Sequence, residues 1–356
     1  MECRSLVEIP SSCSHLHKLQ KLDMENCYNL KIIPAHMNLA SLESVSMMGC
    51  SRLRQLPVIS TNITKLLVSE ADVKEVPASI RLCSRLQRLT IRNSHNFKAI
   101  TYIPTSVTHL ELSNTGIEKI PDCIKALHRL QYPFLFSCKR LISLPELPGS
   151  LVFLLAEDCE SLETVFFPLN TSHMQLYFNN CFKLGEQTRR AIIQQSVANG
   201  NACLPGREVP REFDHRARGN SLTIPLNGNR ALSPYTRFSV CLVVSVKHQT
   251  EGGMIFCTIV KDNLDPIYQT VYLLSCRTDH LFIFDTCFRD FEDYIEESGE
   301  KIVFEFRSDS RDLNVIECGI QSYESEYIEE EEEEEEDNDS VTSGSYYTES
   351  SEGFED

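Results

Sequence analysis

The chain lacks the long apolar run that a membrane-spanning helix needs. None of its 356 residues lies in an uninterrupted apolar stretch that approaches roughly 18 residues. The N-terminus, MECRSLVEIPSSC, has no basic region followed by an apolar core, so we expect no signal peptide. Both absences favour an ordinary soluble globular protein.

The sequence also lacks the short motifs that are typical of enzymes and metalloproteins. It has no HExxH, no CxxC pair, no GxSxG and no GxGxxG, and its histidines are scattered. A GxxxxGK[ST] phosphate loop is missing too, and no basic stretch interleaved with aromatic residues indicates nucleic-acid binding. We therefore expect a non-enzymatic protein with no catalytic residues, no metal site and no cofactor.

Basic residues are missing from the C-terminal end. Residues 324–356 hold 16 Asp and Glu and no Lys or Arg, so they supply almost all of the net charge of −17 and leave −1 for the rest. Such a segment has too few branched apolar residues to fold, and we expect residues 323–356 to be a disordered acidic tail. It is either a solvated extension or a segment that attracts a basic partner or masks a basic surface such as Arg88 and Arg92.

Cysteine, in contrast, is abundant, with 15 residues. An odd number in a chain long enough to build a core argues against a secreted disulfide scaffold. It favours reduced thiols in the cytoplasm, with the nucleus as a second compartment. The sequons Asn62-Ile63-Thr64 and Asn170-Thr171-Ser172 keep a minority case for an extracellular receptor open, which glycans on these asparagines would reveal.

Several cysteines mark a repeat of 21 to 23 residues. The anchor positions of eight successive repeats are Cys27, Cys50, Ala71, Ser94, Thr115, Cys138, Cys159 and Cys181. Five positions before them stand Leu22, Val45, Leu66, Leu89, Leu110, Pro133, Leu154 and Leu176. This spacing is typical of leucine-rich repeats, in which short strands stack to form a solenoid with a common core.

The anchor residues are all small, and they vary among Cys, Ala, Ser and Thr. A metal ligand would not tolerate alanine, so we interpret the anchor cysteines as packing residues in a narrow inward turn. Prolines in the later half of the repeats predict irregular convex segments. The chain opens with only the second half of a repeat, so we expect Met1 to begin inside a longer array, as a fragment, a truncated product or an alternatively started chain.

The pattern changes after Cys181. Residues 185–200 form a polar helix-forming run with Ile192 and Ile193, which predicts a helix over the open end of the solenoid. Short apolar runs then follow at 220–226, 237–246, 253–262, 269–276, 280–288, 301–308 and 314–320, and they predict an all-β sandwich. We divide the ordered chain into a solenoid of about eight repeats at 1–184, a capping helix and linker at 185–202, and a β-sandwich at 203–322.

These repeats, followed by LPGREVP at 204–210 and HRARGNSLTI at 215–224, resemble the C-terminal part of plant intracellular disease-resistance receptors of the TIR-NB-ARC-LRR class. ECGI at 317–320 resembles the closing strand of the same part. The resemblance covers about residues 3–322. It implies that the segment after the repeats is the C-terminal jelly-roll and immunoglobulin-like domain, called C-JID. The nucleotide switch and the signalling domain of the class have no counterpart in this sequence.

Outward positions of the predicted strands would line the concave face of the solenoid. The candidate protein-binding residues are basic in the fourth repeat and aromatic in the sixth to eighth: Arg88, Arg92, Tyr132, Phe134, Phe136, Phe153 and Tyr177. An exposed aromatic cluster usually marks an interface, and the alternative is that the β-sandwich folds back and buries it. The resemblance implies as partner a pathogen effector, a guarded host protein or a full-length receptor in trans. The alternative function is a non-enzymatic scaffold that holds a host partner.

Overall fold

The computed structural model describes residues 3–34, 37, 39–56, 60–168, 174–197, 200–226, 236–248, 252–262, 264–287 and 299–324. Most of the predicted acidic tail and the sequon at Asn170 therefore lie outside the described residues. No described helix is long and apolar enough to cross a membrane.

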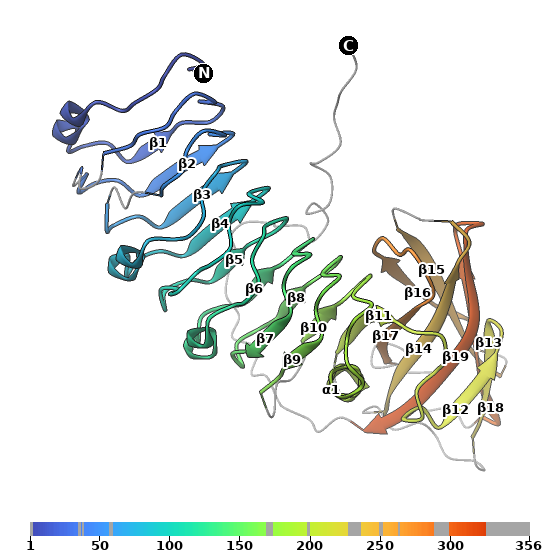
Figure 1. Ribbon diagram of the computed structural model, residues 1–356. Coiled ribbons are helices and arrows are strands. Elements are labelled where there is room, and N and C mark those ends of the chain that lie inside the picture. The colour runs from blue at the N-terminus through green and yellow to red at the C-terminus, as the bar shows by residue number, and fades with distance from the viewer. Residues whose placement is uncertain are drawn as a thin grey trace. The chain divides into compact units, whose positions relative to one another are not determined.

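One short strand per repeat runs parallel to its neighbours along the solenoid, as the repeat predicts (Figure 1). These strands are β1 (Lys21–Asp23), β2 (Ser44–Met48), β3 (Lys65–Ser69), β4 (Arg88–Arg92), β5 (His109–Glu111), β6 (Tyr132–Phe134), β8 (Phe153–Leu155) and β10 (Gln175–Tyr177). Leu66 pairs with Leu89 and Leu89 with Leu110, and all three are buried. The inward residues therefore stack in one column, which is the core of a leucine-rich-repeat solenoid.

The anchor cysteines lie in that core and connect successive repeats. Cys138 is fully buried and donates its thiol hydrogen to the carbonyl of Leu112 in the preceding repeat, with Sγ and O 2.9 Å apart. Cys181 does the same to the carbonyl of Ala156 at 2.8 Å. The described cysteines form no disulfides, and no described group of His, Cys, Asp and Glu could hold a metal ion. The burial and the hydrogen bonds of the anchor cysteines confirm their interpretation as packing residues.

The backbone takes the left-handed conformation one residue before each anchor. The φ angle lies between +50° and +71° at Asn26, Gly49, Glu70, Asn93, Asn114, Ser137, Asp158 and Asn180. Glycine and asparagine accept this conformation most readily, and they hold five of the eight positions. This kink ends the strand and directs the chain inward, so that the anchor side chain points into the core.

The outer part of each repeat is irregular, as the prolines predict. Three 3-10 helices there each begin directly after a proline, whose fixed φ and missing donor suit a helix start. They are η1 (Ser11–His15), η2 (Ala78–Leu82) and η3 (Asp122–Ala126). Two short parallel strands, β7 (Ser143–Glu146) and β9 (Thr164–Phe166), form a separate small sheet.

Helix α1 (Glu186–Val197) and strand β11 (Asn201–Pro205) continue the solenoid beyond the last repeat. Ile192 and Ile193 of α1 are buried in the solenoid core, at the place where the sequence predicts a covering helix. Strand β11 pairs in parallel with β10 and antiparallel with β17 (His280–Cys287). The described strands thus form one 13-stranded sheet that runs from the repeats into the C-terminal part.

The C-terminal part contains a strand in each apolar run predicted from the sequence. Besides β17 they are β13 (Ser221–Pro225), β14 (Thr236–Val246), β15 (Gly253–Lys261), β16 (Ile267–Leu273), β18 (Lys301–Ser308) and β19 (Leu313–Glu324). An additional strand, β12 (His215–Arg218), pairs with β19 at the edge of the long sheet. The order β13-β18-β15-β16 makes a second, antiparallel sheet. Residues of both sheets, such as Leu242 of β14 and Phe304 of β18, share one hydrophobic core.

Candidate functional site

Most of the predicted basic and aromatic residues of the concave face lie on adjacent strands, at neighbouring outward positions. Strand register places Arg88 beside His109, and His109 beside Tyr132. The rings of His109 and Tyr132 are stacked, with centroids 4.9 Å apart. His109 therefore joins two groups of residues that the sequence analysis treated as separate. His109 stands five residues before Asn114, as Arg88 stands five residues before Asn93. This shared spacing could have identified His109 as a candidate residue.

The surroundings of His109 favour the neutral form of its ring. Burial lowers its pKa, and the positive charge of Arg88 lowers it further, because both disfavour the imidazolium form. A neutral ring beside an arginine is compatible with stacking on Tyr132 and adds no repulsion to the row.

Three further rings, those of Phe134, Phe153 and Tyr177, form a second group of contacts on β6, β8 and β10. The centroids of Phe134 and Phe153 are 5.9 Å apart, and those of Phe153 and Tyr177 are 5.0 Å apart. Both distances lie in the range of favourable aromatic pairs. We call Tyr132, Phe134, Phe153 and Tyr177 the aromatic ladder. Its members are half-buried, so each ring is held by its neighbours and still offers surface.

The remaining predicted residues lie near the ladder or away from it. Phe136 follows β6 and is 39% exposed. Arg92 lies on β4 four residues after Arg88, so it is outside the row of Arg88, His109 and Tyr132. It is half-buried. Neither arginine forms an ion pair with a described carboxylate. Tyr177 packs against the core of the C-terminal strands, so those strands cover the far end of the ladder and leave its other members half-exposed.

Residues 275–280, which we call the docking segment, fix the C-terminal strands against the last repeats. The guanidinium of Arg277 contacts Asp158 Oδ1 at 2.6 Å and Glu160 Oε1 at 2.8 Å. The backbone N–H of Asn180 donates to Nε2 of His280, with the two nitrogens 2.9 Å apart. Because Asp158 and Asn180 are left-handed residues of the last two repeats, the kinks that end the strands also supply this contact.

Cys276 and His280 of the docking segment form a buried cluster with Cys203 of β11. Cys276 and Cys203 are each 1% exposed, and His280 is fully buried. A hydrogen bond from the Cys203 thiol lowers the pKa of Cys276, and His280 lowers it further, whereas burial raises the pKa of Cys203. Such a thiol would be reactive if a reagent could reach it, but burial excludes a substrate from this cluster. We assign it to the packing of the junction.

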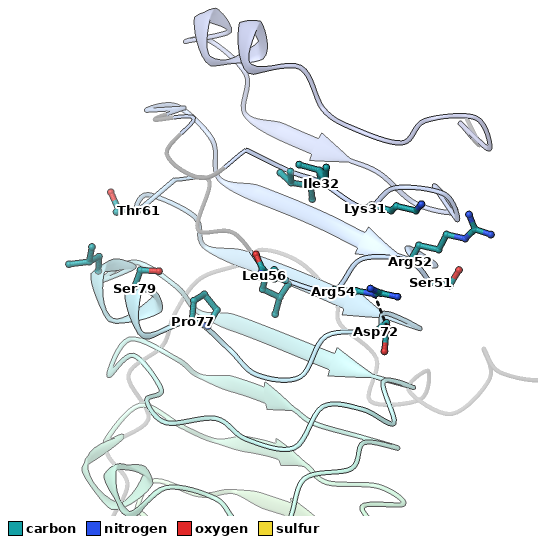
Figure 2. Close-up of a pocket in the computed structure, with 13 residues that line it drawn as sticks. Lys31, Ile32, Ser51, Arg52, Arg54, Leu56, Thr61, Asp72, Pro77 and Ser79 are labelled. Carbon is teal, nitrogen blue, oxygen red and sulfur yellow. Dashed lines mark ion pairs between the residues drawn. The ribbon is translucent and has the colours of Figure 1, made fainter.

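A groove of about 840 Å³ lies among the outer segments of the N-terminal repeats (Figure 2). Lys31, Arg52 and Arg54 bring positive charge to it, and Arg54 Nε lies 3.4 Å from Asp72 Oδ2. The Arg54 side chain is 81% exposed, so water screens this pair. None of the residues predicted for binding lines this groove.

Comparisons with known proteins identify relatives for the whole chain. Residues 204–332 match the C-JID domain. The chain is 47% identical over 365 residues to the disease resistance protein RML1B of Arabidopsis thaliana, covering 100% of this chain and 33% of that protein. It is 50% identical over 244 residues to RML1A of the same plant, with 68% and 24% covered. It is 32% identical over 324 residues to the probable disease resistance protein RPP1, also from Arabidopsis thaliana, with 87% and 26% covered.

The repeated parallel strands and the C-JID match define a leucine-rich-repeat protein with a C-terminal C-JID domain. The chain corresponds to the C-terminal part of a plant disease-resistance protein of the TIR-NB-ARC-LRR class, which confirms the resemblance found in the sequence. It spans about a third or less of the length of the relatives it matches.

Proposed function

We propose that this chain is the recognition part of a plant disease-resistance receptor and that it binds a protein ligand on the concave face of its repeats. The ligand is a pathogen effector or a host protein that an effector alters. The observation that carries the proposal is the placement of Arg88, His109 and the aromatic ladder at outward positions of adjacent strands, with ring contacts within two groups.

The chemistry of this row suits a protein surface. Aromatic and arginine side chains supply most of the binding energy at many interfaces, and rings lose little conformational entropy when they bind. Phe134, Phe153 and Tyr177 of the ladder already pack against one another, so binding would not have to order them. Arg88 is exposed at one end and would pair with a ligand carboxylate, while the rings would cover apolar side chains beside it.

The C-terminal strands have a supporting role in this proposal. Two sheets that share one core support a β-sandwich of the jelly-roll and immunoglobulin-like kind. The docking segment holds this domain at the Tyr177 end of the ladder, where it could add contacts to a bound ligand. The chain would act without catalysis. Its contact with the ligand would be passed to the switch and signalling domains of a full-length receptor, in the same molecule or in trans.

We place this activity in the cytoplasm, with the nucleus as a second compartment. The free thiols of the described cysteines support a reducing environment. The amide nitrogen of Asn62, to which a glycan would be attached, donates to the carbonyl of Ala40 at 2.8 Å. The mass of the protein expressed in plant tissue tests this point, because a glycan on Asn62 or Asn170 would contradict it.

The binding proposal is tested by replacing Phe134 and Phe136 together with serine. Phe166→Ser is the matched control, since Phe166 is 59% exposed and lies on β9 outside the concave face. Proteins captured from infected and from healthy leaf tissue are compared for the wild type and both variants. We expect a partner from infected tissue that the wild type and the control retain and the double variant loses by about 100-fold.

The melting temperature of each variant separates binding from packing. We expect the double variant to melt within about 4 °C of the wild type, because both rings are partly exposed. Parallel loss of binding and of stability would instead favour a packing role for these rings. A partner captured equally from healthy and infected tissue would favour the scaffold function.

A further inference from the structure

Strand β16 lies at the edge of the second sheet and is unusually poorly protected. Among the described residues it pairs only with β15. Its sequence, IYQTVYL, contains no charged residue and no proline. Edge strands of natural proteins usually carry lysine, proline or a bulge, which prevent pairing with another chain. The opposite edge strand, β13, ends in Pro225 and so has such protection.

The outward face of β16 is aromatic. Tyr268 is 75% exposed and Tyr272 is 74% exposed, and Thr270 lies between them on the same face. Register places Thr270 beside Phe256 of β15, which is itself 40% exposed. We call Tyr268, Thr270 and Tyr272 the tyrosine edge. Its opposite face, with Ile267 and Leu273, belongs to the core, so the edge is held rigidly.

The sequence of β16 reads almost the same in both directions about Thr270. In an antiparallel pair related by a two-fold axis at Thr270, Tyr268 of one copy would face Tyr272 of the second copy. Each exposed aromatic residue would thus meet an aromatic residue, and Ile267 would meet Leu273, whereas Gln269 would face Val271. A strand chosen only for its core contacts would not need this symmetry.

We propose that two copies of the chain pair antiparallel through β16, centred on Thr270, and join their four-stranded sheets into one continuous sheet. Hydrogen bonds between the two edges would supply the attraction, and the cross-strand tyrosine pairs would set the register. No charged side chain of β16 opposes the approach of its own copy. The proposal does not depend on the ligand of the concave face.

The size of this contact predicts a weak, reversible dimer. Four tyrosines that each bury roughly 150 Å² contribute about 600 Å², and the paired edges add to this. We expect the total buried area to lie near the lower end of the range for specific interfaces, which is about 1,200 Å². We therefore expect a dissociation constant in the range of about 1 to 100 µM. Neighbouring copies held together in a larger assembly would pair more readily than free chains.

Sedimentation velocity of the full chain over a concentration series tests the dimer. We expect a monomer–dimer equilibrium in the wild type. Thr270→Lys would place two ammonium groups opposite each other at the axis and raise the dissociation constant by about tenfold or more. Thr223→Lys is the matched control, because Thr223 is an exposed threonine on β13 at the other edge of the same sheet. It should leave the equilibrium unchanged.

Cross-linking tests the register. Thr270→Cys should form a disulfide-linked dimer under mild oxidation above the background of the wild type, whereas Thr223→Cys should not. The variant Tyr268→Ser with Tyr272→Ser, which keeps the edge hydrogen bonds, should weaken the dimer without unfolding the chain. A chain that stays monomeric up to about 100 µM would overturn the proposal. So would a dimer that Thr270→Lys leaves intact, or open-ended assemblies in place of a closed dimer.

Discussion

The repeats and the C-terminal part of the molecule bury polar groups in different ways. Among described residues 3–156, the buried polar residues are small hydroxyls: Ser46, Ser60, Ser69, Thr90, Ser94, Ser113 and Thr115. From residue 157 onward they include Glu157, Asn179, Asn180, Lys261 and His280. Among the described residues, buried amide, carboxyl, amine and imidazole side chains are therefore found only from the last two repeats, next to the junction, onward.

The difference follows from how far along the chain the hydrogen-bond partner of each buried polar group lies. Thr115 Oγ1 donates to the carbonyl of Leu112, three residues away, at 2.8 Å. The contact between Asn180 and His280 joins residues 100 positions apart. A hydroxyl that is satisfied locally fits any repeat, whereas a buried imidazole needs one particular partner. The repeats therefore need no distant partner for these hydroxyls, whereas the junction depends on particular long-range pairs.

The largest effect should come from the column of leucines. Leu110→Ala removes a fully buried side chain at the centre of the solenoid and should cost about 3 kcal/mol of unfolding free energy, because a cavity remains. Hydrogen exchange should show loss of protection in the neighbouring repeats and little change in β14, because repeats contact mainly their neighbours. Leu82→Ala, at a 58% exposed position, is the control. Equal loss of protection in β14 would contradict the separation of the two regions.

The next largest effect is the pH dependence of stability that Asp285 on β17 causes. Burial raises its pKa to about 7, although the hydroxyls of Tyr323 and Ser239 and the charge of Arg237 oppose this. The unfolded chain releases the proton near pH 4, so the folded state holds it more tightly. The stability contributed by Asp285 therefore falls as the pH rises from about 4 and levels off above about 7.

Asp285→Asn should remove this dependence. The difference between the folded and unfolded pKa corresponds to at most about 4 kcal/mol. Water partly screens this half-buried carboxyl, so we expect the variant to exceed the wild type by about 2 kcal/mol in unfolding free energy at pH 8 and to match it near pH 4. Urea unfolding across this pH range measures the difference. Glu157, whose pKa burial raises to about 8, contributes the same trend to both proteins and cancels in the comparison. A difference that does not vary with pH would show that Asp285 is not protonated in the folded state.

The smallest effect tests the docking segment. Arg277→Ala removes contacts to two carboxylates from a side chain that is 33% exposed, and should cost about 1 kcal/mol. Arg307→Ala should cost less, about 0.3 kcal/mol, because its pair with Glu305 is longer, at 3.6 Å, and its side chain is 76% exposed. Urea unfolding compares the two. Equal losses would indicate that the junction does not depend on Arg277.

The repeats could be predicted closely because one frame fixes every position in them. The spacing that placed Leu110 and Cys138 in the core also placed Tyr132 and Phe134 on the concave face. Short apolar runs likewise predicted β14 and β18. Strand order in the C-terminal part was not predictable, since it depends on contacts between distant segments such as β11 and β17.

The sequence predicted which residues of the candidate surface point outward, but it did not predict how their side chains are arranged. The frame gave the outward position of His109, but its stacking on Tyr132 depends on how adjacent strands pair. Strands β11 and β12 were missed because Asn201–Pro205 and His215–Arg218 are short and carry polar or turn-forming residues. The docking segment has no sequence pattern of its own. Its role arises from Asp158, Glu160 and Asn180, more than 90 residues away.

The left-handed residue that precedes every anchor makes each repeat a unit that could be exchanged for another. One repeat could be inserted or deleted between two such residues, and we call the point of joining the seam. The strand, the kink and the buried anchor would be kept on both sides of the seam. The concave side chains N-terminal to the seam would then move by one strand spacing, about 4.8 Å, relative to the docking segment. Unequal recombination between repeats would thus offer receptor lineages a stepwise way to change which ligands fit, at little expense to folding.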